Sequence, residues 1–487
     1  MKNALLLSAP FYAGYGRAAD EPTLLATGNI SNDNTDLVPE RWVNEALMIL
    51  EENMVMPQLV NRNYDAQFQR FGDVVNISKP QEMTGRRKVD GEAIVKSAAV
   101  SNNIPIKLDQ HLYEAFHVYD GELSLSFTDL VNKYIQPAAL SIARLADKIV
   151  SAQFAQFMWV NNAGQLGSAL DKAALLDLRN TQNKANAHVE GRRLVLTPDS
   201  ETDLLNLDAF TEVDKIGTTA GVINAALGRK FGYDIYMGQQ QPNVATGGTV
   251  TTTTTTVNNT GGYAAGTTVV TVTSGTGISA GEYITIAGDD IPHLVDGVST
   301  NDITIYPALK RAVADAAAVT VYDGDTVDQA STAVADGGDG STAGYRKGWH
   351  NYIVLDGTPG VPEVGQLVTF GTAGDGTAAN YVIIDVSSGQ ILLDRPLEAA
   401  IADGATANFG PTGSYNFGFH PNAMTFVTRP LQPATGGPVT ATVGYNGLAM
   451  RITISYDSDY QRHLVTLDML CGVSVLETGL GAVLFGD

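Results

Sequence analysis

The chain has 487 residues, room for about three average domains, and its 44% hydrophobic content excludes a fully disordered polymer. The net charge of −22 disfavours general binding of nucleic acid or anionic lipid. The single cysteine, Cys471, excludes an intramolecular disulfide framework and a cysteine-based zinc site. No apolar run reaches the ~20 residues that span a bilayer, so we expect no transmembrane helix.

The first 36 residues show little periodicity, and we interpret them as an N-terminal arm. The start, Met1–Ala9, also resembles a secretory signal, with a cleavage site near Arg17–Asp20. Pro10 interrupts the apolar run early, and Lys2 is the only positive charge before it. The arm is therefore the preferred interpretation, and the signal peptide is the alternative.

A helix is predicted from Pro39 to about Met56, where Pro57 disfavours further helix. The alternating segment 71–79 predicts a strand, and Ile104–Leu108 predicts a second one. The polar stretch between them carries a basic cluster of Arg86, Arg87 and Lys88. A strand, a basic tip and a returning strand form a long hairpin, which is only marginally stable alone and needs a surface to lie on.

The longest predicted helix runs from Thr128 or Asp129 to about Trp159, with a kink at Pro137. A second helix is predicted over 171–189, and a short one from Asp199 or Ser200. Segments 193–196 and 230–236 are predicted strands.

The composition changes at Pro242, and the next 170 residues are rich in Thr, Gly, Ala, Val and Asp. Residues 242–411 hold 5 Lys or Arg against 18 Asp or Glu, which contributes −13 of the total charge. Three apolar patterns in this segment recur in the same order after 83 to 88 residues. We interpret the repeat as two tandem β-modules joined by a linker at 336–341. After Pro411 the earlier composition returns, which indicates a core interrupted by an insertion.

No residue set predicts catalysis, a metal or a cofactor. The seven histidines share no metal-ligand spacing, although His463 and Cys471 leave a Cys/His nucleophile pair as an alternative. Segment 323–328 begins like a calcium loop, but Val334 stands where an EF-hand needs glutamate. A looser calcium site among these aspartates stays open. The one candidate site is an inter-subunit contact formed by Arg86, Arg87 and Lys88, which would pair with a partner's carboxylates.

The order of several short motifs resembles the major capsid (coat) proteins of tailed double-stranded DNA bacteriophages. The similarity is greatest to the coat protein family of short-tailed Salmonella phages, which carries a β-rich insertion domain. The motifs are Glu51–Val55, Leu59–Arg62, Gly72–Ile77, Gln110-His111, Phe127–Leu130, Tyr134–Ala139, Gly232–Tyr236, Phe419-His420, Val427–Leu431 and Gly472–Leu476.

The resemblance implies an α+β tailed-phage capsid fold with an arm, an extended loop, a spine helix, a peripheral domain and an axial domain. It divides this chain into an arm and first helix (1–63), an extended loop (64–118), a spine helix and peripheral domain (119–192), a first axial part (193–241), β-module 1 with linker (242–344), β-module 2 (345–412) and a second axial part (413–487). The arm is longer than the family pattern, and the insertion has two modules.

The implied function is structural rather than enzymatic: a subunit that forms hexamers and pentamers of an icosahedral virion, assembled in the bacterial host cytoplasm. The implied partners are further copies, scaffolding, portal and decoration or cement proteins, and packaged DNA without sequence-specific contacts, with no cofactor and no membrane. A secreted β-repeat adhesin is the alternative, and it leaves the helical region 128–190 unexplained. A β-rich glycan-degrading enzyme would need a carboxylate pair, and none stands out.

Overall fold

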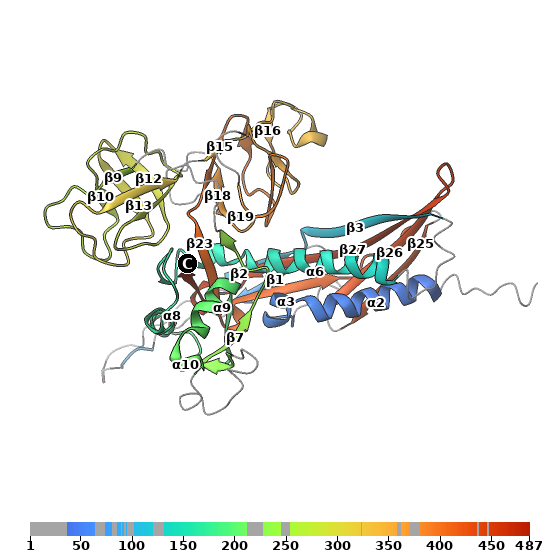
Figure 1. Cartoon of the computed structure of the whole chain (residues 1–487), viewed down its shortest axis with the longest axis horizontal. Coiled ribbons are helices and arrows are strands. Elements are labelled where there is room, and N and C mark those ends of the chain that lie inside the picture. The colour runs from blue at the N-terminus through green and yellow to red at the C-terminus, as the bar shows by residue number, and fades with distance from the viewer. Residues whose placement is uncertain are drawn as a thin grey trace, which may run out of the picture. The chain divides into compact units, whose positions relative to one another are not determined.

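The structure is a computed structural model, and the residues it describes are 37–63, 74–79, 85–88, 90–91, 94, 102–119, 131–211, 227–244, 254–322, 324–357, 362–370, 380–435, 438–445 and 448–487 (Figure 1). The predicted arm and the predicted helix start at Thr128 or Asp129 lie outside these residues. The chain divides into two compact units. The first comprises Met1–Glu52, Tyr113–Leu140 and Pro430–Met469, and the second comprises Asn53–Leu112, Ser141–Arg429 and Leu470–Asp487.

The first unit contains helix α2 (Leu37–Asn53), π-helix η2 (Val131–Ile135) and antiparallel strands β25 (Val439–Tyr445) and β26 (Leu448–Asp457). Strand β26 also pairs with the first half of β27 (Arg462–Val475), and β3 (Gln110–Tyr119) pairs with β27 as well. Within this sheet the opposed residues Arg451 and Asp468 form an ion pair, with Nε and Oδ1 3.0 Å apart. Cross-strand pairs of opposite charge stabilise a fixed register.

The apolar residues that predicted the first helix recur at i, i+4, i+7 and i+8. Of these, Trp42, Ala46 and Leu50 are buried and Ile49 is half-buried. The predicted end at Met56 is wrong, because α2 stops at Asn53 and a separate short helix, α3 (Met56–Leu59), follows. Pro57 lies in the first turn of α3, where a missing N–H removes no helical hydrogen bond.

The core of the second unit is a mixed sheet in the order β4-β28-β23-β5-β7-β6, with β8 also paired to β23. Every residue of the neighbouring strands β23 and β28 is buried, as expected for strands covered on both faces. The strands are β4 (Asn162–Gly164), β5 (Arg192–Leu196), β6 (Arg229–Lys230), β7 (Tyr233–Met237), β8 (Asn243–Val244), β23 (Gly413–Phe419) and β28 (Gly481–Gly486).

The predicted helix to Trp159 is broken into shorter pieces. The π-turn η2 leads into α6 (Gln136–Ser151), and α7 (Phe154–Phe157) follows separately. Pro137 is the second residue of α6 and directly follows the π-helical segment η2, and the kink predicted there stays a prediction. The remaining helices and short 3-10 turns are α8 (Lys172–Lys184), α9 (Pro198–Leu205), α10 (Asp208–Thr211), η4 (Pro421–Ala423) and η5 (Thr478–Leu480).

Two further predicted elements, one helix and one strand, are interrupted where the backbone adopts a positive φ. Helix α8 ends at Lys184, short of Val189, and Asn186 just beyond it has a φ of 57°. The single strand predicted over 230–236 is a tight hairpin of β6 and β7, because Phe231 and Gly232 both have positive φ.

Two six-stranded antiparallel sheets follow β8 (Figure 1). Their strand orders are β10-β13-β12-β11-β14-β9 and β17-β20-β19-β18-β22-β15, which is the same topology twice. The first module (254–322) has β9 (Thr254–Thr256), β10 (Val269–Thr271), β11 (Tyr283–Ile286), β12 (His293–Ser299), β13 (Asp302–Tyr306) and β14 (Ala318–Tyr322). The second module (325–409) has β15 (Asp325–Thr326), β17 (Ile353–Val354), β18 (Leu367–Phe370), β19 (Tyr381–Ser387), β20 (Gln390–Leu393) and β22 (Thr406–Phe409). The second module also has η3 (Val334–Asp336) and a two-stranded pair, β16 (Gly344–Tyr345) with β21 (Ile401–Ala402).

The pairing changes from one module to the next between Tyr322 and Asp325, earlier than the glycine-rich linker predicted at 336–341. That segment belongs to the second module, where Asp336 N–H and Gly337 N–H close a short turn on Ala333 and Val334. Composition alone marked the glycine-rich segment as a linker, although its backbone is held by turn hydrogen bonds.

Candidate functional site: the extended loop and the seats of the two modules

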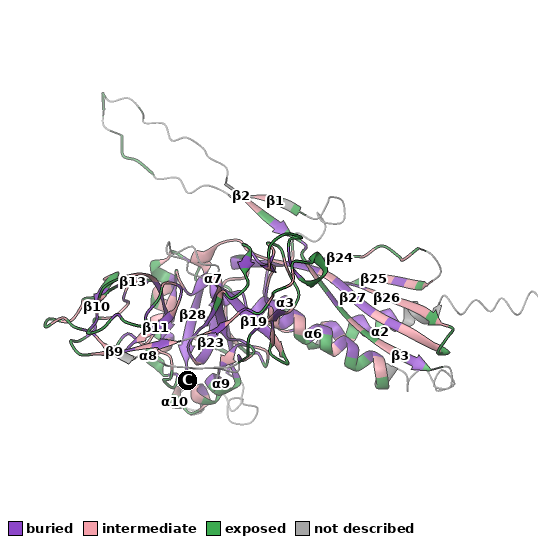
Figure 2. Ribbon diagram, turned by 90° about the horizontal axis from the view of Figure 1, so that it is seen from above, coloured by how far each residue is buried: buried purple, intermediate pink, exposed green. Residues whose placement is uncertain are grey.

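The extended loop is built on two antiparallel strands, β1 (Val74–Lys79) and β2 (Asn102–Lys107), which are the two strands predicted on either side of the basic tip. Figure 2 shows β1 and β2 side by side at the start of the loop. The base is anchored by Ile106 and Leu108, which pack with Val427. At Gly472 an added Cβ would lie 2.0 Å from the Lys107 carbonyl oxygen, so only glycine lets the loop base approach β27 this closely.

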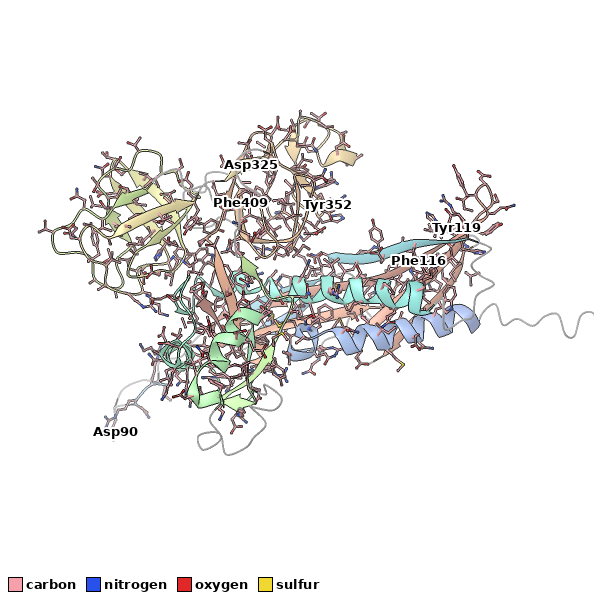
Figure 3. All side chains as sticks on the ribbon, viewed as in Figure 1. Asp90, Phe116, Tyr119, Asp325, Tyr352 and Phe409 are labelled. Atoms are coloured by element: carbon pink, nitrogen blue, oxygen red, sulfur yellow. The ribbon has the colours of Figure 1, made fainter. Side chains whose placement is uncertain are left out.

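Beyond the base, the described part of the loop is exposed. Arg86, Arg87 and Lys88 are all exposed, Ile94 is 73% exposed, and Asp90 marks the same segment in Figure 3. Within the described residues, none of the three cations forms an ion pair. The three predicted site residues are thus all exposed, and their contact with a partner stays a prediction.

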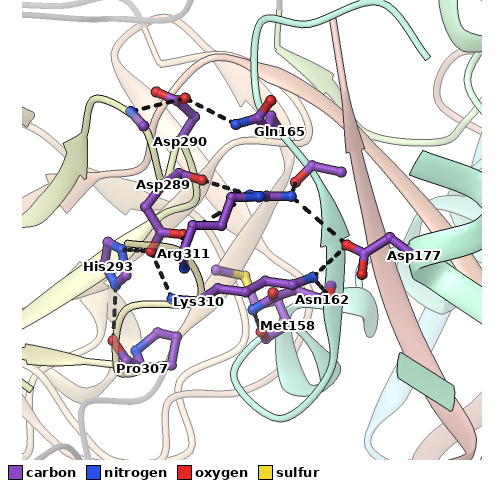
Figure 4. A network of polar contacts seen from close by, with 12 residues as sticks. Met158, Asn162, Gln165, Asp177, Asp289, Asp290, His293, Pro307, Lys310 and Arg311 are labelled. Atoms are coloured by element: carbon purple, nitrogen blue, oxygen red, sulfur yellow. Dashed lines mark hydrogen bonds and ion pairs between the residues drawn. The ribbon is translucent and has the colours of Figure 1, made fainter. Parts of the chain in front are cut away.

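The first module is seated on the core by a polar network around Asp289, whose side chain is fully buried (Figure 4). One carboxylate oxygen of Asp289 accepts from the N–H of Lys310 (2.9 Å) and the other from the N–H of Arg311 (2.8 Å). The ring of His293 lies 3.1 Å from the same carboxylate. Asp289 therefore fixes the backbone that carries both cations.

Those cations reach the core sheet and helix α8. Lys310 Nζ donates to Asp177 at 2.9 Å and to the Asn162 carbonyl, and Arg311 Nη2 donates to the Gly164 carbonyl at 3.0 Å. Burial lowers the pKa of Lys310, and its hydrogen bond and charge interaction with Asp177 oppose that shift. Because every cation here is already paired, the network is a structural seat.

An aromatic contact adds to the same seat. The Trp159 ring stacks on Tyr283, with centroids 6.5 Å apart, and meets Tyr306 at 5.9 Å. Aromatic pairs of this kind contribute about 0.5–1.5 kcal/mol beyond the area they bury.

The second module has a different seat. The Lys148 ammonium on α6 donates to the Ile384 carbonyl at 3.2 Å, and Gln110 donates to the Asp394 carbonyl at 3.1 Å. Asp394 is fully buried and accepts from the Val382 N–H and from Arg395, each at 2.9 Å. Burial raises the pKa of Asp394, and the adjacent guanidinium opposes the shift.

The modules also contact each other. The carbonyl of Gly281 in the first module accepts from Thr369 (2.8 Å) and Asn408 (3.0 Å) of the second, and Tyr283 bonds Asn380. The equivalent glycine of the second module, Gly365, packs on Pro242, 2.9 Å from an added Cβ. The same corner thus makes a contact in each module: in the first module with the second, and in the second module with Pro242.

The described residues contain no group of three or more His, Cys, Asp or Glu placed to hold a metal ion. Asp325, in the segment that begins like a calcium loop, is buried and accepts from the N–H groups of Thr326 and Gly357 (Figure 3). Asp323 lies outside the described residues. The carboxylate of Asp325 is thus used for local backbone hydrogen bonds.

The alternative nucleophile pair gains no support from its geometry. Cys471 is fully buried, which raises the pKa of its thiol and keeps it protonated and unreactive. His463 instead places its ring 4.8 Å from that of Tyr456. In the part of the chain that the structure describes, no helix is long and apolar enough to cross a membrane.

Comparison with known proteins gives matches to solved structures alone. No family model matches the chain, and no curated protein matches it. A structure titled Mycobacterium phage Che8 is 13% identical, with 88% of this chain and 90% of that chain covered and a TM-score of 0.41. The capsid structure of Cyanophage P-SCSP1u is 11% identical (85% and 84% covered, TM-score 0.36), and the mature capsid of bacteriophage PhiM1 is 10% identical (85% and 82% covered, TM-score 0.37). All three TM-scores lie below 0.5, so the likeness is distant.

Sequence reasoning missed both module seats. The available signal was the pair Asp289-Asp290 and the pair Lys310-Arg311, which concentrate charge in an otherwise weakly charged segment. Nothing in their spacing joins them to Asp177, which is 133 residues away from Lys310.

Proposed function

We propose that the chain is a major capsid subunit of a tailed double-stranded DNA bacteriophage, assembling with copies of itself into hexamers and pentamers of an icosahedral head. The ordered motifs that resemble phage coat proteins support the proposal. So does an acidic chain of net charge −22, which disfavours adhesion to packaged DNA.

The extended loop is the structural feature that most strongly supports the proposal. Two-stranded hairpins are marginal in water without a surface to cover them. Among the described residues of the hairpin, those at the base are packed, whereas the segment with Arg86, Arg87 and Lys88 is exposed. A basic tip on an acidic chain has an electrostatically complementary partner in a second copy. A contact between different surfaces of identical copies is heterologous, and such contacts generate rings when the rotation between copies closes.

The domain assignments follow the same proposal. We assign 64–118 to the loop, 119–192 to the spine and peripheral domain, and 193–241 with 413–487 to the axial domain. Residues 1–63 would form the arm and first helix, and 242–412 the inserted modules, which offer an acidic platform for decoration proteins. Scaffolding and portal proteins complete the proposed partners, and the virion the proposed location.

Electron microscopy of the purified protein, expressed with its neighbouring genes, is the direct test. Closed shells of uniform diameter are expected. Extended rods or membrane-associated protein would instead favour the adhesin alternative, which the repeated β-modules suggest.

The loop contact has its own test, the variant Arg86→Ala/Arg87→Ala/Lys88→Ala. We expect the variant to fold normally but to give few or fragile shells, because the contact loses its cations. The matched control, Lys172→Ala/Lys184→Ala/Lys347→Ala, removes the same charge from three other exposed cations. Shell yield and heat resistance equal to the control would refute the loop contact.

A further inference from the structure

One buried carboxylate has no part in either module seat. Asp147 lies on α6 and is 5% exposed, between neighbours Ala146 and Ile149 that are also buried. Aspartate is almost never this fully buried unless its carboxylate is paired, so its burial calls for an explanation.

Asp147 satisfies the start of another helix. Its Oδ1 accepts from the N–H groups of Val55 and Met56, both at 3.1 Å, and its Oδ2 lies 3.2 Å from the Val55 nitrogen. These are the amides at the N-terminus of α3, where Val55 offers no capping side chain. Pro57 has no N–H, and the Gln58 N–H bonds back to the Val55 carbonyl. The carboxylate of α6 therefore supplies the cap that the local sequence lacks.

Asp147 forms no ion pair with any residue that the structure describes. The ionisable residues of the neighbouring elements are Glu51 at the end of α2, Arg62 after α3, and Arg144 and Lys148 on α6. Among the described residues none of them forms an ion pair with Asp147; Arg144 is exposed, and Lys148 donates to Ile384. Burial raises the pKa of Asp147 to about 7, although the two backbone hydrogen bonds oppose the shift.

We propose that Asp147 and the amides of Val55 and Met56 form a protonation-sensitive latch that fastens the segment after α2 to α6. The protonated acid keeps a carbonyl oxygen for the amides and has no charge to desolvate, so the latch is most firmly closed in acid. Ionisation places an unpaired charge in the interior and favours opening to water. Its use in controlling assembly rests on the proposed capsid role, whereas the latch itself does not.

The direction of the pH effect follows from the thermodynamic linkage between protonation of Asp147 and closing of the latch. An acid with a raised pKa in the closed state contributes stability at low pH, and that contribution is lost as pH rises from the ordinary value of about 4 toward 7. Opening should therefore increase on the order of 50-fold between about pH 5 and pH 8, with most of the change below pH 7.

Hydrogen exchange of the full-length protein tests the latch, because the donors are the Val55 and Met56 amides themselves. Corrected for intrinsic rates, exchange over 53–60 should rise with pH in the wild type and stay flat in Asp147→Asn. Asn keeps the acceptor oxygen and cannot ionise. The control Asp203→Asn alters another carboxylate that accepts a backbone N–H, from Leu170 at 2.8 Å, and should leave the wild-type profile unchanged.

Either of two results overturns the latch. One is a flat wild-type profile, which needs no variant. The other is an Asp147→Asn protein that retains the wild-type pH dependence. Both experiments measure hydrogen exchange of the subunit itself. Their outcome therefore does not depend on whether the protein forms shells.

Discussion

The two β-modules share one architecture and differ in how they are held. Their strand orders are identical, and both carry a β-bulge in the same hairpin, after Val295 and after Ile383. Their seats differ: Asp289, Lys310 and Arg311 secure the first module, whereas Asp394 and α6 secure the second. The repeated part depends on a pattern of apolar residues, and the seats depend on single polar side chains.

The match extends to single hydrogen bonds. The hydroxyl of Tyr263 accepts from the Thr271 N–H at 2.9 Å, and that of Tyr345 accepts from the Val354 N–H at 2.8 Å. The Gly281 N–H donates to Val295 at 2.8 Å, and the Gly365 N–H donates to Ile383 at 2.7 Å. Such agreement permits matched substitutions in the two modules.

The largest difference should come from Asp289→Ala. Loss of this carboxylate leaves two backbone N–H groups and the buried His293 ring without their acceptor. We expect the first module to lose about 3–5 kcal/mol of stability while the second keeps its own. Hydrogen exchange resolved by module measures this directly. The control Asp302→Ala removes an exposed carboxylate of the same module and should change little; equal losses would show that the seat is unimportant.

Asp394→Ala should destabilise the second module and leave the first unchanged, with a smaller loss of stability than Asp289→Ala causes. One backbone amide, that of Val382, loses its acceptor, and Arg395 keeps Glu398 and the Asn380 carbonyl. We expect about 2–4 kcal/mol, confined to the second module. Because burial raises the pKa of Asp394, its contribution falls as pH rises, and Asp394→Asn should remove that dependence. A loss spread evenly over both modules would contradict separate seats.

The smallest effects should come from the paired substitutions Tyr263→Phe and Tyr345→Phe. Each removes one hydroxyl acceptor, at a cost of about 1 kcal/mol. Tyr345 is only 2% exposed, so the Val354 N–H that loses its acceptor should cost more stability than the Thr271 N–H. Thermal unfolding of the two variants checks the order, and a neutral Tyr345→Phe would break the proposed equivalence.

The sequence allowed prediction of what depends on local pattern. Alternating apolar residues predicted the loop strands, and recurring apolar patterns predicted the repeated modules. The basic cluster is exposed, and its contact with a partner stays a prediction. Helix ends were less predictable, because Pro57 lies in the first turn of a new helix instead of ending the preceding one. A proline fixes φ and lacks an N–H in either role, so its side of the helix boundary depends on neighbouring contacts.

The seats and the latch were beyond sequence reasoning for a different reason. Asp147 meets Val55 across 92 residues, and Asp177 meets Lys310 across 133. A single carboxylate that pairs across so many residues produces no periodic pattern in the sequence. Its burial depends on tertiary contacts that the sequence pattern does not show.

The pairing of β8 with β23 has a consequence for the history of the chain. Val244 faces Gly413 and Asn243 faces Ser414, so the points where the chain leaves and rejoins the core sheet are neighbours in one ladder. A genetic exchange that replaced everything between them would leave the register of that sheet intact. The modules could then diversify, duplicate or be lost through such exchanges, while the sequence of the core sheet changed slowly.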